Sequence, residues 1–431
     1  MRTREYPVLA DEDCELIARL AIGTSDGTAR VLGYLLLRDR QPAFAAAPAT
    51  RLEIQIGTGE SRNAVSAALN ALDERDLVIA STVERDGRGR PPKAWRPRAD
   101  VPATVERVYS HHAADLLTQA AAVAAETGAE DVRPGDGSEQ SGGDGSLTVG
   151  LNWRPNVLHA PLFAAVEGGD YEDRGMTVGI RSFEGSGRAL DALRAGEADV
   201  VVAGAATTVR TRAGGAPLVP LAPLFQRAMA VLYTTRDAFG GPLDGVERLR
   251  GRRIGMPRSS ETGLLVRLFL SQSGLLDETT VVDVGGEERA ALRSRRADVV
   301  TGTFADPRTL EADGTTVDVL PIADHFPIYG PTLVTTEGTL RERYDDLERF
   351  LAGTLAGRET VLADPGEAVR AVVGSSASPD ALERGRRDLT DAVSEFGSSK
   401  AVRNRGWGWH TVEEWRRLNT ALGHAGLLDV P

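Results

Sequence analysis

The sequence predicts an α/β protein with a small N-terminal domain, made of helices and one β-hairpin, and a larger domain of two similar lobes. Helical and hairpin patterns fill the first hundred residues. Further on, a pattern of helix end, tight turn and buried strand occurs twice, at 192–201 and 291–300. A chain of 431 residues also exceeds the size that one hydrophobic core usually serves, so several compact units are expected.

The composition is acidic and almost free of lysine. The net charge is −12, and Lys93 and Lys400 are the lysines of the sequence. This surface is typical of adaptation to high salt, as in a halophile, although a GC-rich genome would also favour arginine. Because the whole chain is negative, nucleic acid could be bound only through a local basic patch.

The cellular compartment of the protein is predicted from features that the sequence lacks. Residues 1–10 contain no apolar stretch of the kind found in signal peptides, and no run of 18 apolar residues occurs. Cys14 is the one cysteine, which excludes an internal disulfide and a cysteine-based zinc site. These observations predict a cytoplasmic protein.

The N-terminal domain is expected at 1–100 and begins with helical patterns. The expected segments are 11–20, 28–38, 51–56 and 61–72. In the last of them, Ser61 can cap a helix whose first outward side chains are Arg62, Asn63 and Ser66. This layout is typical of a recognition helix.

A hairpin with a basic turn follows this helix. The strands are expected at 77–83 and 91–95, and the glycine-rich turn at 86–90 carries Arg88 and Arg90, with Lys93 just beyond. Residues 84–100 contain six basic and three acidic residues, so this stretch is positive in a negative chain. The local patch that DNA binding requires is therefore present.

Residues 11–98 resemble archaeal winged helix-turn-helix regulators. The resemblance implies that the helix starting at Ser61 lies in the major groove and that the hairpin, as the wing, touches backbone or minor groove. The DNA-binding residues expected on this basis are Ser61, Arg62, Asn63, Ser66, Arg88, Arg90 and Lys93. The alternative is a protein-interaction module whose arginine run is a solvated turn.

Two connecting segments come next. Residues 101–128 predict one long helix with a broad apolar stripe, which would pair two chains in a homodimer or, alternatively, pack on its own domain. Residues 129–146 are rich in Gly and Ser and predict a flexible tether. The ligand domain is then expected at 147–431, with its second lobe at about 235–328.

Each repeat is preceded by strand patterns, at 147–151 and 176–180 in the first set and at 253–256 and 280–284 in the second. Alternating strands and helices predict two doubly wound lobes with largely parallel sheets. In such folds ligands bind at the carboxyl ends of the strands, here between the lobes.

Residues 147–425 resemble the thiamine-pyrimidine-precursor binding proteins and the related fungal pyrimidine synthases. The resemblance rests on LNWRPNVLH at 151–159, on 164–176, on 251–255 and on 363–365, with a tail that carries Trp407, Trp409 and Trp415. It implies a type II periplasmic-binding-protein-like fold and a small heteroaromatic ligand, a thiamine pyrimidine precursor. Much of the pattern is shared with sulfonate and nitrate binders.

The residues of the first motif suit a flat ligand. Trp153 offers a face for stacking, Asn152 and Asn156 offer donors and acceptors, and His159 can do either. Alternatively, Trp153 caps the core and His159 is only a neighbour of a helix start. The other expected ligand-binding residues follow strands and are Glu184, Ser259, Ser260 and Thr262.

The sequence argues against synthase chemistry. The resemblance places Ala203 where the synthases have a cofactor-binding lysine and Thr207 where they have a histidine, and 325–329 lacks their cysteines. No lysine lies between Lys93 and Lys400, so an imine with a cofactor has almost no candidate amine in the cleft between the lobes. We therefore expect no enzyme activity and no cofactor.

Together these features predict a cytoplasmic, ligand-responsive transcription regulator with double-stranded DNA and a pyrimidine-type metabolite as partners. The alternative is the solute-binding component of an ABC-type uptake system for a thiamine precursor or a sulfonate. The ligand stays open because residues 304–306 depart from the acidic and aromatic pattern expected in pyrimidine binders.

Overall fold

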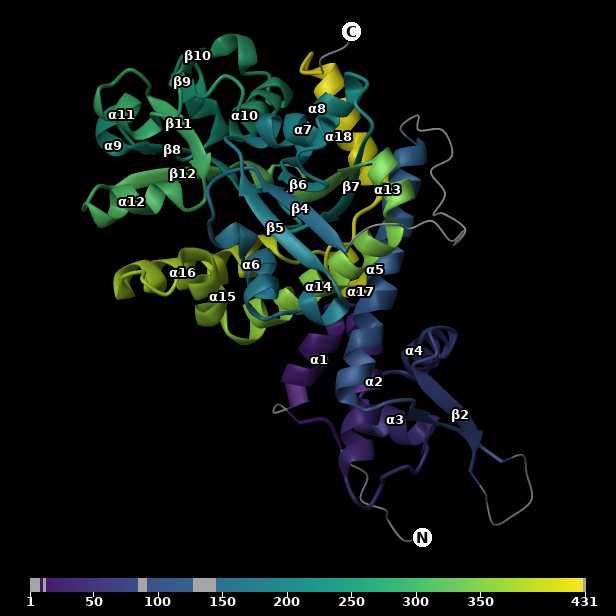
Figure 1. Cartoon of the computed structure of the whole chain (residues 1–431). Helices are drawn as coiled ribbons and strands as arrows, with labels where there is room; N and C mark the ends of the chain where they lie inside the picture. Colours follow the sequence, from purple (N-terminus) through teal and green to yellow (C-terminus); the bar gives the residue numbers. More distant parts are fainter. Residues whose placement is uncertain (1–7, 11–12, 84–90, 127–144, 326, 429–431) are drawn as a thin grey trace.

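The structure is a computed structural model that describes residues 8–10, 13–83, 91–126, 145–325 and 327–428. Figure 1 shows a small N-terminal domain joined by the long helix α5 (Val101–Glu126) to a larger body of two lobes. The expected wing turn at 86–90, with Arg88 and Arg90, lies outside the described residues. So do residues 129–144 of the expected tether.

The N-terminal domain combines short helices with a three-stranded antiparallel sheet of order β1-β3-β2. Its elements are α1 (Cys14–Ala21), α2 (Asp26–Arg40), β1 (Ala49–Thr50), α3 (Arg51–Thr58), α4 (Arg62–Glu74), β2 (Val78–Thr82) and β3 (Lys93–Pro97). Side-chain caps fix three helix starts, because the hydroxyls of Ser25, Thr50 and Ser61 each accept a backbone N–H of the first turn. The four helical patterns of the sequence therefore form helices.

The first lobe is built on a five-stranded sheet of order β5-β4-β6-β13-β7. The strands are β4 (Ser146–Leu151), β5 (Thr177–Ser182), β6 (Val200–Ala203), β7 (Leu218–Pro223) and β13 (Thr332–Thr336). Strands β5, β4 and β6 run parallel, and β13 runs antiparallel to both β6 and β7.

The second lobe repeats this arrangement in the order β10-β9-β11-β8-β12. Its strands are β8 (Ala230–Thr235), β9 (Arg253–Met256), β10 (Thr280–Asp283), β11 (Val299–Thr303) and β12 (Val317–Pro321). Strands β10, β9 and β11 run parallel, and β8 runs antiparallel to both β11 and β12. In each sheet four strands therefore point the same way and one, β13 or β8, runs against them, which confirms the predicted two-lobed α/β fold with largely parallel sheets.

Helices cover both sheets and form the C-terminal part of the chain (Figure 1). Those of the lobes are α6 (Ala160–Glu167), α7 (Ser186–Arg194), α8 (Ala205–Ala213), α9 (Arg236–Phe239), α10 (Glu261–Gln272), α11 (Glu288–Arg293) and α12 (Asp306–Ala312). Those after β12 are α13 (Glu337–Glu342), α14 (Tyr344–Ala363), α15 (Pro365–Val373), α16 (Pro379–Phe396), α17 (Lys400–Arg405) and α18 (Val412–His424). Among the described residues, no helix combines the length and apolar character needed to cross a bilayer.

The sequence repeat has the same structure in both lobes. At its turn, Gly196 and Arg295 occupy equivalent positions and both are left-handed, with φ of 73° and 55°. Three residues later, the carboxylates of Asp199 and Asp298 each accept a backbone N–H of the neighbouring strand at 2.8 Å. Each aspartate thus ties the start of its strand to the neighbouring parallel strand, β4 in the first lobe and β9 in the second.

Helix α5 is buried within its own chain. It packs against α14 and β7 of the first lobe, and its apolar side chains belong to a cluster that also includes residues of the N-terminal domain. The predicted stripe of Val105, Val108, Ala113, Leu116, Leu117 and Ala120 is buried throughout. The stripe therefore offers no surface for pairing two chains, and a homodimer stays a prediction without this support.

Candidate functional site

Hydrogen-bonded polar groups lie at the carboxyl ends of β4 and β6. Asn152 follows β4 directly, and its amide nitrogen donates to the Ser186 hydroxyl at 3.4 Å. The same hydroxyl, at the buried start of α7, accepts the backbone N–H of Gly204 at 3.0 Å. Ser186 therefore links the two strand ends where ligands of this architecture bind.

His159 holds the Asn152 side chain in place through a hydrogen bond. Its Nε2 lies 3.1 Å from Asn152 Oδ1, and the ring is only 1 % exposed. Burial lowers the pKa of His159 to about 4, so the ring is neutral near pH 7. A carbonyl-type oxygen opposite Nε2 makes this nitrogen the donor, and we infer that His159 orients Asn152 rather than touching a ligand.

Trp153 is the exposed aromatic side chain of this strand end. Its exposed fraction is 54 %, although it lies only two positions after Leu151, the fully buried last residue of β4. An indole that capped the core would be largely covered. The structure therefore leaves its ring free for stacking.

Two further expected ligand-binding residues have other surroundings. Asn156 caps the short helix at Val157–His159, because its Oδ1 accepts the N–H of Leu158 at 3.0 Å and its Nδ2 donates to the Arg154 carbonyl at 2.9 Å. Its amide is thus used locally. Glu184 is exposed at the loop before α7.

The second lobe contributes the start of α10. The Ser260 hydroxyl caps this helix by accepting the N–H of Gly263 at 3.0 Å, and it lies 3.1 Å from the Thr262 hydroxyl. Ser259 is exposed, whereas Ser260 and Thr262 are partly buried. These three residues thus lie together at one helix start, as the sequence predicted for a polar substituent.

Glu261 crosses from the second lobe to the first. Its Oε1 accepts the N–H of Ala206 at 3.0 Å, and its Oε2 accepts the N–H and the hydroxyl of Thr207 at 2.8 and 2.5 Å. Burial raises the pKa of Glu261 above its ordinary value, although the hydrogen bonds from Thr207 and Ala206 and the nearby charge of Arg210 act to lower it. The carboxylate occupies the N-terminus of α8 and stands at the first turn of α10, two places that favour negative charge.

Sequence reasoning missed Ser186 and Glu261. A glutamate in the first turn of a capped helix is explained by the dipole of that helix alone, so nothing in the sequence signals that Glu261 reaches another lobe. The signal for Ser186 was its place after a glycine at a helix start that follows a strand.

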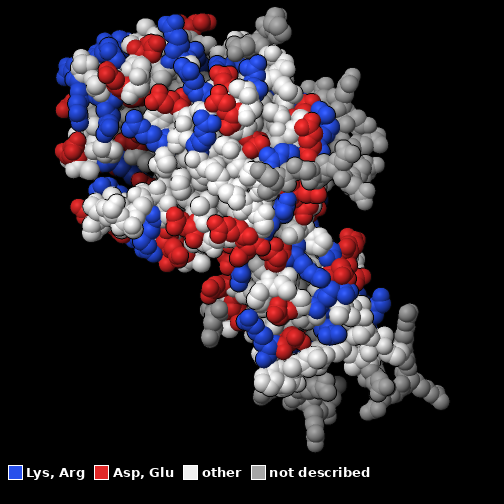
Figure 2. Space-filling model, in the orientation of Figure 1, with Lys and Arg blue, Asp and Glu red and all other residues white. Residues whose placement is uncertain are grey.

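A second polar bridge between the lobes joins α12 to α16. The guanidinium of Arg308 pairs with Asp388 and Asp391, each at 2.6 Å. Beside it, the rings of Phe304 and Phe396 lie 5.3 Å apart. Figure 2 shows a recess between the second lobe and the part formed by α15 and α16. Phe304 is the first of the three residues, 304–306, that differ from the pattern expected in pyrimidine binders. Its ring therefore packs against the ring of Phe396.

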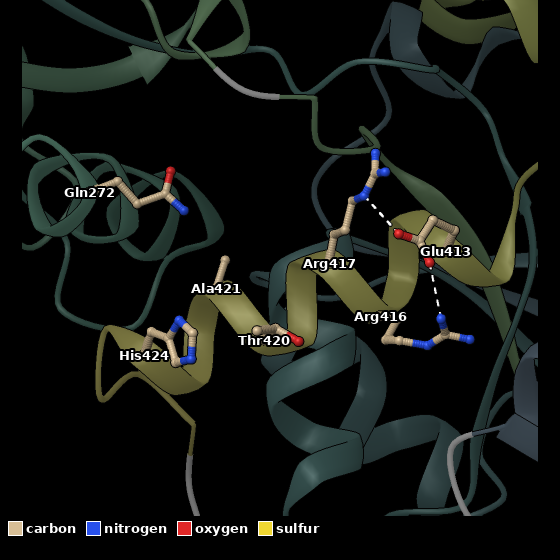
Figure 3. A pocket seen from close by; sticks show the side chains of 7 residues that line it. All are labelled: Gln272, Glu413, Arg416, Arg417, Thr420, Ala421 and His424. Carbon is tan, nitrogen blue, oxygen red and sulfur yellow. Dashed lines mark hydrogen bonds and ion pairs between the residues drawn. The ribbon is translucent and has the colours of Figure 1, made fainter.

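The hollow in Figure 3 lies elsewhere. Gln272 at the end of α10 lines it together with α18 residues, and α10 spans about 18 Å from Glu261 to this end. Arg416 and Arg417 both pair with Glu413, at 3.0 and 2.9 Å, which neutralises part of their charge. Since the hollow is far from the strand ends, it is not part of the candidate site.

No group of three or more His, Cys, Asp or Glu side chains within the described ranges is placed to hold a metal ion. At the two positions where the synthases carry lysine and histidine, Ala203 is fully buried and Thr207 is bonded to Glu261.

The comparisons with known proteins agree on the large domain. Residues 156–368 match the family model described as NMT1/THI5 like. The riboflavin-binding protein RibY of Chloroflexus aurantiacus is 26 % identical over 295 residues, which cover 66 % of this chain and 82 % of that protein. The formylaminopyrimidine-binding protein of Halalkalibacterium halodurans is 24 % identical over 297 residues, 66 % of this chain and 87 % of the relative.

Solved structures show the same fold. The periplasmic aliphatic sulphonate binding protein SsuA from Escherichia coli superposes with a TM-score of 0.51 at 16 % identity, over 66 % of this chain and 94 % of that one. The alkanesulfonate-binding protein SsuA from Xanthomonas axonopodis pv. citri, bound to MOPS, gives a TM-score of 0.50 at 18 % identity, with the same coverage.

These findings overturn the regulator prediction. The relatives are solute-binding proteins, so the predictions of transcription regulation, of a DNA partner and of a cytoplasmic location are wrong. Among the residues expected to touch DNA, Ser61, Arg62, Asn63 and Lys93 are exposed. Ser66 is partly buried and bonds back to the Arg62 carbonyl at 2.8 Å. The hydroxyls of Ser61 and Ser66 thus both bond to the backbone of α4, so a polar pattern at this helix start is explained by the helix itself.

The two repeated lobes, the polar strand ends between them and the solved structures lead to one conclusion: the large domain has the two-lobed fold of periplasmic binding proteins, and its residues 156–368 are similar to the NMT1/THI5-like family.

Proposed function

We propose that this chain binds a small heteroaromatic solute between its lobes. The observation that carries the proposal is the exposed indole of Trp153 beside the hydrogen-bonded set of Asn152, Ser186 and Gly204. Two relatives are named for riboflavin and for a formylaminopyrimidine, and both compounds are flat nitrogen heterocycles. A site with one stacking face and fixed amide groups suits such ligands.

Each group has a distinct role in the proposed complex. Trp153 stacks on the ring of the solute, and Asn152, oriented by His159, bonds to its edge. From the second lobe, the hydroxyls of Ser260 and Thr262 bond to a polar substituent. Glu184 and Ser259 are exposed at the rim and contact the solute only when the lobes close on it.

The proposed activity is binding without chemical change. An imine-forming cofactor needs an amine, and the sequence has no lysine between Lys93 and Lys400. Ala203 and Thr207 supply neither an amine nor an imidazole. We therefore propose that the solute leaves the site unaltered.

The biological role that fits best is the solute-binding component of an ABC-type uptake system. It is supported by the fold that this chain shares with sulfonate-binding proteins, of which one is named as periplasmic. In this role the chain works outside the cytoplasm and delivers its solute to a transporter. For residues 13–97 we propose a winged helix-turn-helix fold, on the order of their helices and strands alone.

The test is a binding screen with the purified full chain. Riboflavin, a formylaminopyrimidine and an aliphatic sulfonate are added separately in a thermal-shift assay, and each stabilising compound is titrated by calorimetry. A ligand at 100 times its Kd should stabilise the folded state by about 2.7 kcal/mol. Stabilisation by either heterocycle supports the proposal, and the absence of binding by both would refute it.

A further inference from the structure

We propose that Glu261 determines the ligand class, so that the site accepts neutral or cationic heterocycles and rejects ligands that carry a phosphate, sulfonate or carboxylate group. This inference rests on the proposed function. It concerns the place where the two lobes meet, between the start of α8 and the start of α10.

The start of α8 is already occupied by a carboxylate. Helix N-termini attract anions because their first N–H groups have no partner within the helix. Here the N–H groups of Ala206 and Thr207, together with the Thr207 hydroxyl, all donate to Glu261. A ligand anion would have to displace this carboxylate or lie beside it, and like charges at short distance repel strongly in a partly buried site.

Gly204 shows that the chain accommodates this carboxylate. A Cβ atom at this position would lie 2.1 Å from Glu261 Cδ, too close for any real contact. The backbone of Gly204 has φ of −69°, which every residue type adopts easily. Glycine therefore leaves the space that the Glu261 side chain occupies, and a larger residue here would require that side chain to move.

The location ties Glu261 to the candidate site. Gly204, which faces the carboxylate, donates its own N–H to Ser186, and Ser186 bonds to Asn152 beside Trp153. Ser186 thus connects the strand end that carries Asn152 and Trp153 with Gly204, which directly precedes the helix start that holds Glu261.

The carboxylate also keeps capacity for a ligand. Its two oxygens offer about four acceptor positions, and the first lobe uses three of them. The remaining position, on Oε1, suits an N–H donor such as the amino or ring N–H group of a heterocycle. A charge-assisted bond of this kind is about twice as strong as a neutral one.

The experiment compares compounds that differ only in an anionic group. Riboflavin and riboflavin 5′-phosphate form one pair, and an aminopyrimidine alcohol and its phosphate ester form another. Binding to the full chain is measured by calorimetry for the wild type, for Glu261→Ala and for Gly204→Ala, which forces the carboxylate away without removing it. Matched controls are Glu311→Ala, an exposed glutamate of α12, and Gly27→Ala, where a Cβ meets no atom within 4 Å.

We expect the wild type and both controls to bind a neutral compound at least tenfold more tightly than its phosphate. In Glu261→Ala this preference should shrink at least tenfold, since the helix N–H groups become free for the phosphate, and Gly204→Ala should change it in the same direction. If Glu261→Ala does not fold, Gly204→Ala alone decides. Equal binding of both compounds to the wild type, or an unchanged preference in the folded variants, would overturn the role of Glu261 and leave the proposed function intact. If the wild type binds no neutral compound, the proposed function falls and this inference with it.

Discussion

At the scale of single residues, the two repeat turns solve one backbone problem with different residues. Gly196 and Arg295 both need a left-handed conformation, which costs a residue with a Cβ about 1–2 kcal/mol. Glycine adopts it freely in the first lobe, whereas arginine carries the strain in the second. The difference can be measured as stability.

Gly196→Ala should lower the free energy of unfolding by about 1 kcal/mol, because a Cβ there meets no atom within 4 Å and only backbone strain is added. Arg295→Gly should raise it by up to about 1 kcal/mol, since strain is relieved at some cost in unfolded-state entropy. Urea unfolding of both variants checks these values. If Gly196→Ala raised the free energy of unfolding, or Arg295→Gly lowered it, the two turns would not be equivalent.

Trp153→Ala should weaken binding of a stabilising heterocycle by about 1–3 kcal/mol, the usual contribution of an aromatic stack on a base. Because the side chain is largely exposed, the free energy of unfolding without ligand should change by less than about 0.5 kcal/mol. Calorimetry measures the first value and urea unfolding the second. Trp153→Phe is the control and should retain most of the affinity. An unchanged Kd in the alanine variant would place the solute elsewhere.

Local patterns explain which of these residues could be predicted. The repeat and the strand end at Asn152 and Trp153 are visible in the sequence, because turns, strands and their first loop residues follow from neighbours in the chain. The sequence did not show that Asn156 is a cap or that His159 is covered, since both depend on packing. Glu261 could not be found, because its partners lie 54 and 55 positions away in another lobe.

At the scale of elements, α5 shows how an apolar stripe can mislead. Its spacing correctly predicts a long helix, but spacing does not reveal what covers the stripe. In the structure α14, β7 and the C-terminal tail cover it, and His112 bonds to the Trp407 carbonyl at 2.7 Å. The helix is therefore part of the core of the first lobe.

Leu116→Ala in α5 should destabilise the chain by about 2–5 kcal/mol, because the side chain is fully buried beside the C-terminal tail and its loss leaves a cavity. Urea unfolding followed by tryptophan fluorescence gives the value. Leu52→Ala is the matched control, since Leu52 is 65 % exposed on α3 and should change stability by less than about 0.5 kcal/mol. A small effect at Leu116 would mean that α5 does not belong to this core.

At the scale of the whole molecule, three buried histidines make the fold sensitive to acid. Burial lowers the pKa of His112, His159 and His410 to about 4, from 6.5. Between pH 6.5 and 4 these histidines are protonated in the unfolded chain and neutral in the folded chain. Their contribution to the free energy of unfolding, which is complete above pH 6.5, is therefore lost as the pH falls toward 4. Asp170 opposes this trend, because burial raises its pKa to about 6 and its contribution is lost as the pH rises.

His410→Gln isolates one of these protons. His410 donates from Nε2 to the Leu221 carbonyl at 3.0 Å and accepts the indole N–H of Trp415 at 2.9 Å, so it is neutral in the fold. Between pH 6.5 and 4.5, the free energy of unfolding of the wild type should fall more steeply than that of the variant, by at most about 1.4 kcal/mol per pH unit. His424→Gln, on the exposed end of α18, is the control. Parallel pH curves for wild type and His410→Gln would contradict the assignment.

The way the N-terminal domain is fastened has a mechanical consequence. Arg19 and Tyr109 both bond to Glu359 of α14, at 2.8 and 3.0 Å, and one apolar cluster runs from α1 through α5 into the first lobe. The N-terminal domain, α5 and the first lobe thus pack into one unit. The second lobe is connected to this unit by the chain segments between the lobes, by helix packing and by the bridges of Glu261 and Arg308. If the second lobe rotates when a solute binds, the orientation of the N-terminal domain relative to the first lobe stays the same, and its orientation relative to the second lobe changes. A partner that contacts both the N-terminal domain and the second lobe would therefore distinguish the solute-bound chain from the free chain. A partner that contacts only the N-terminal domain and the first lobe would not.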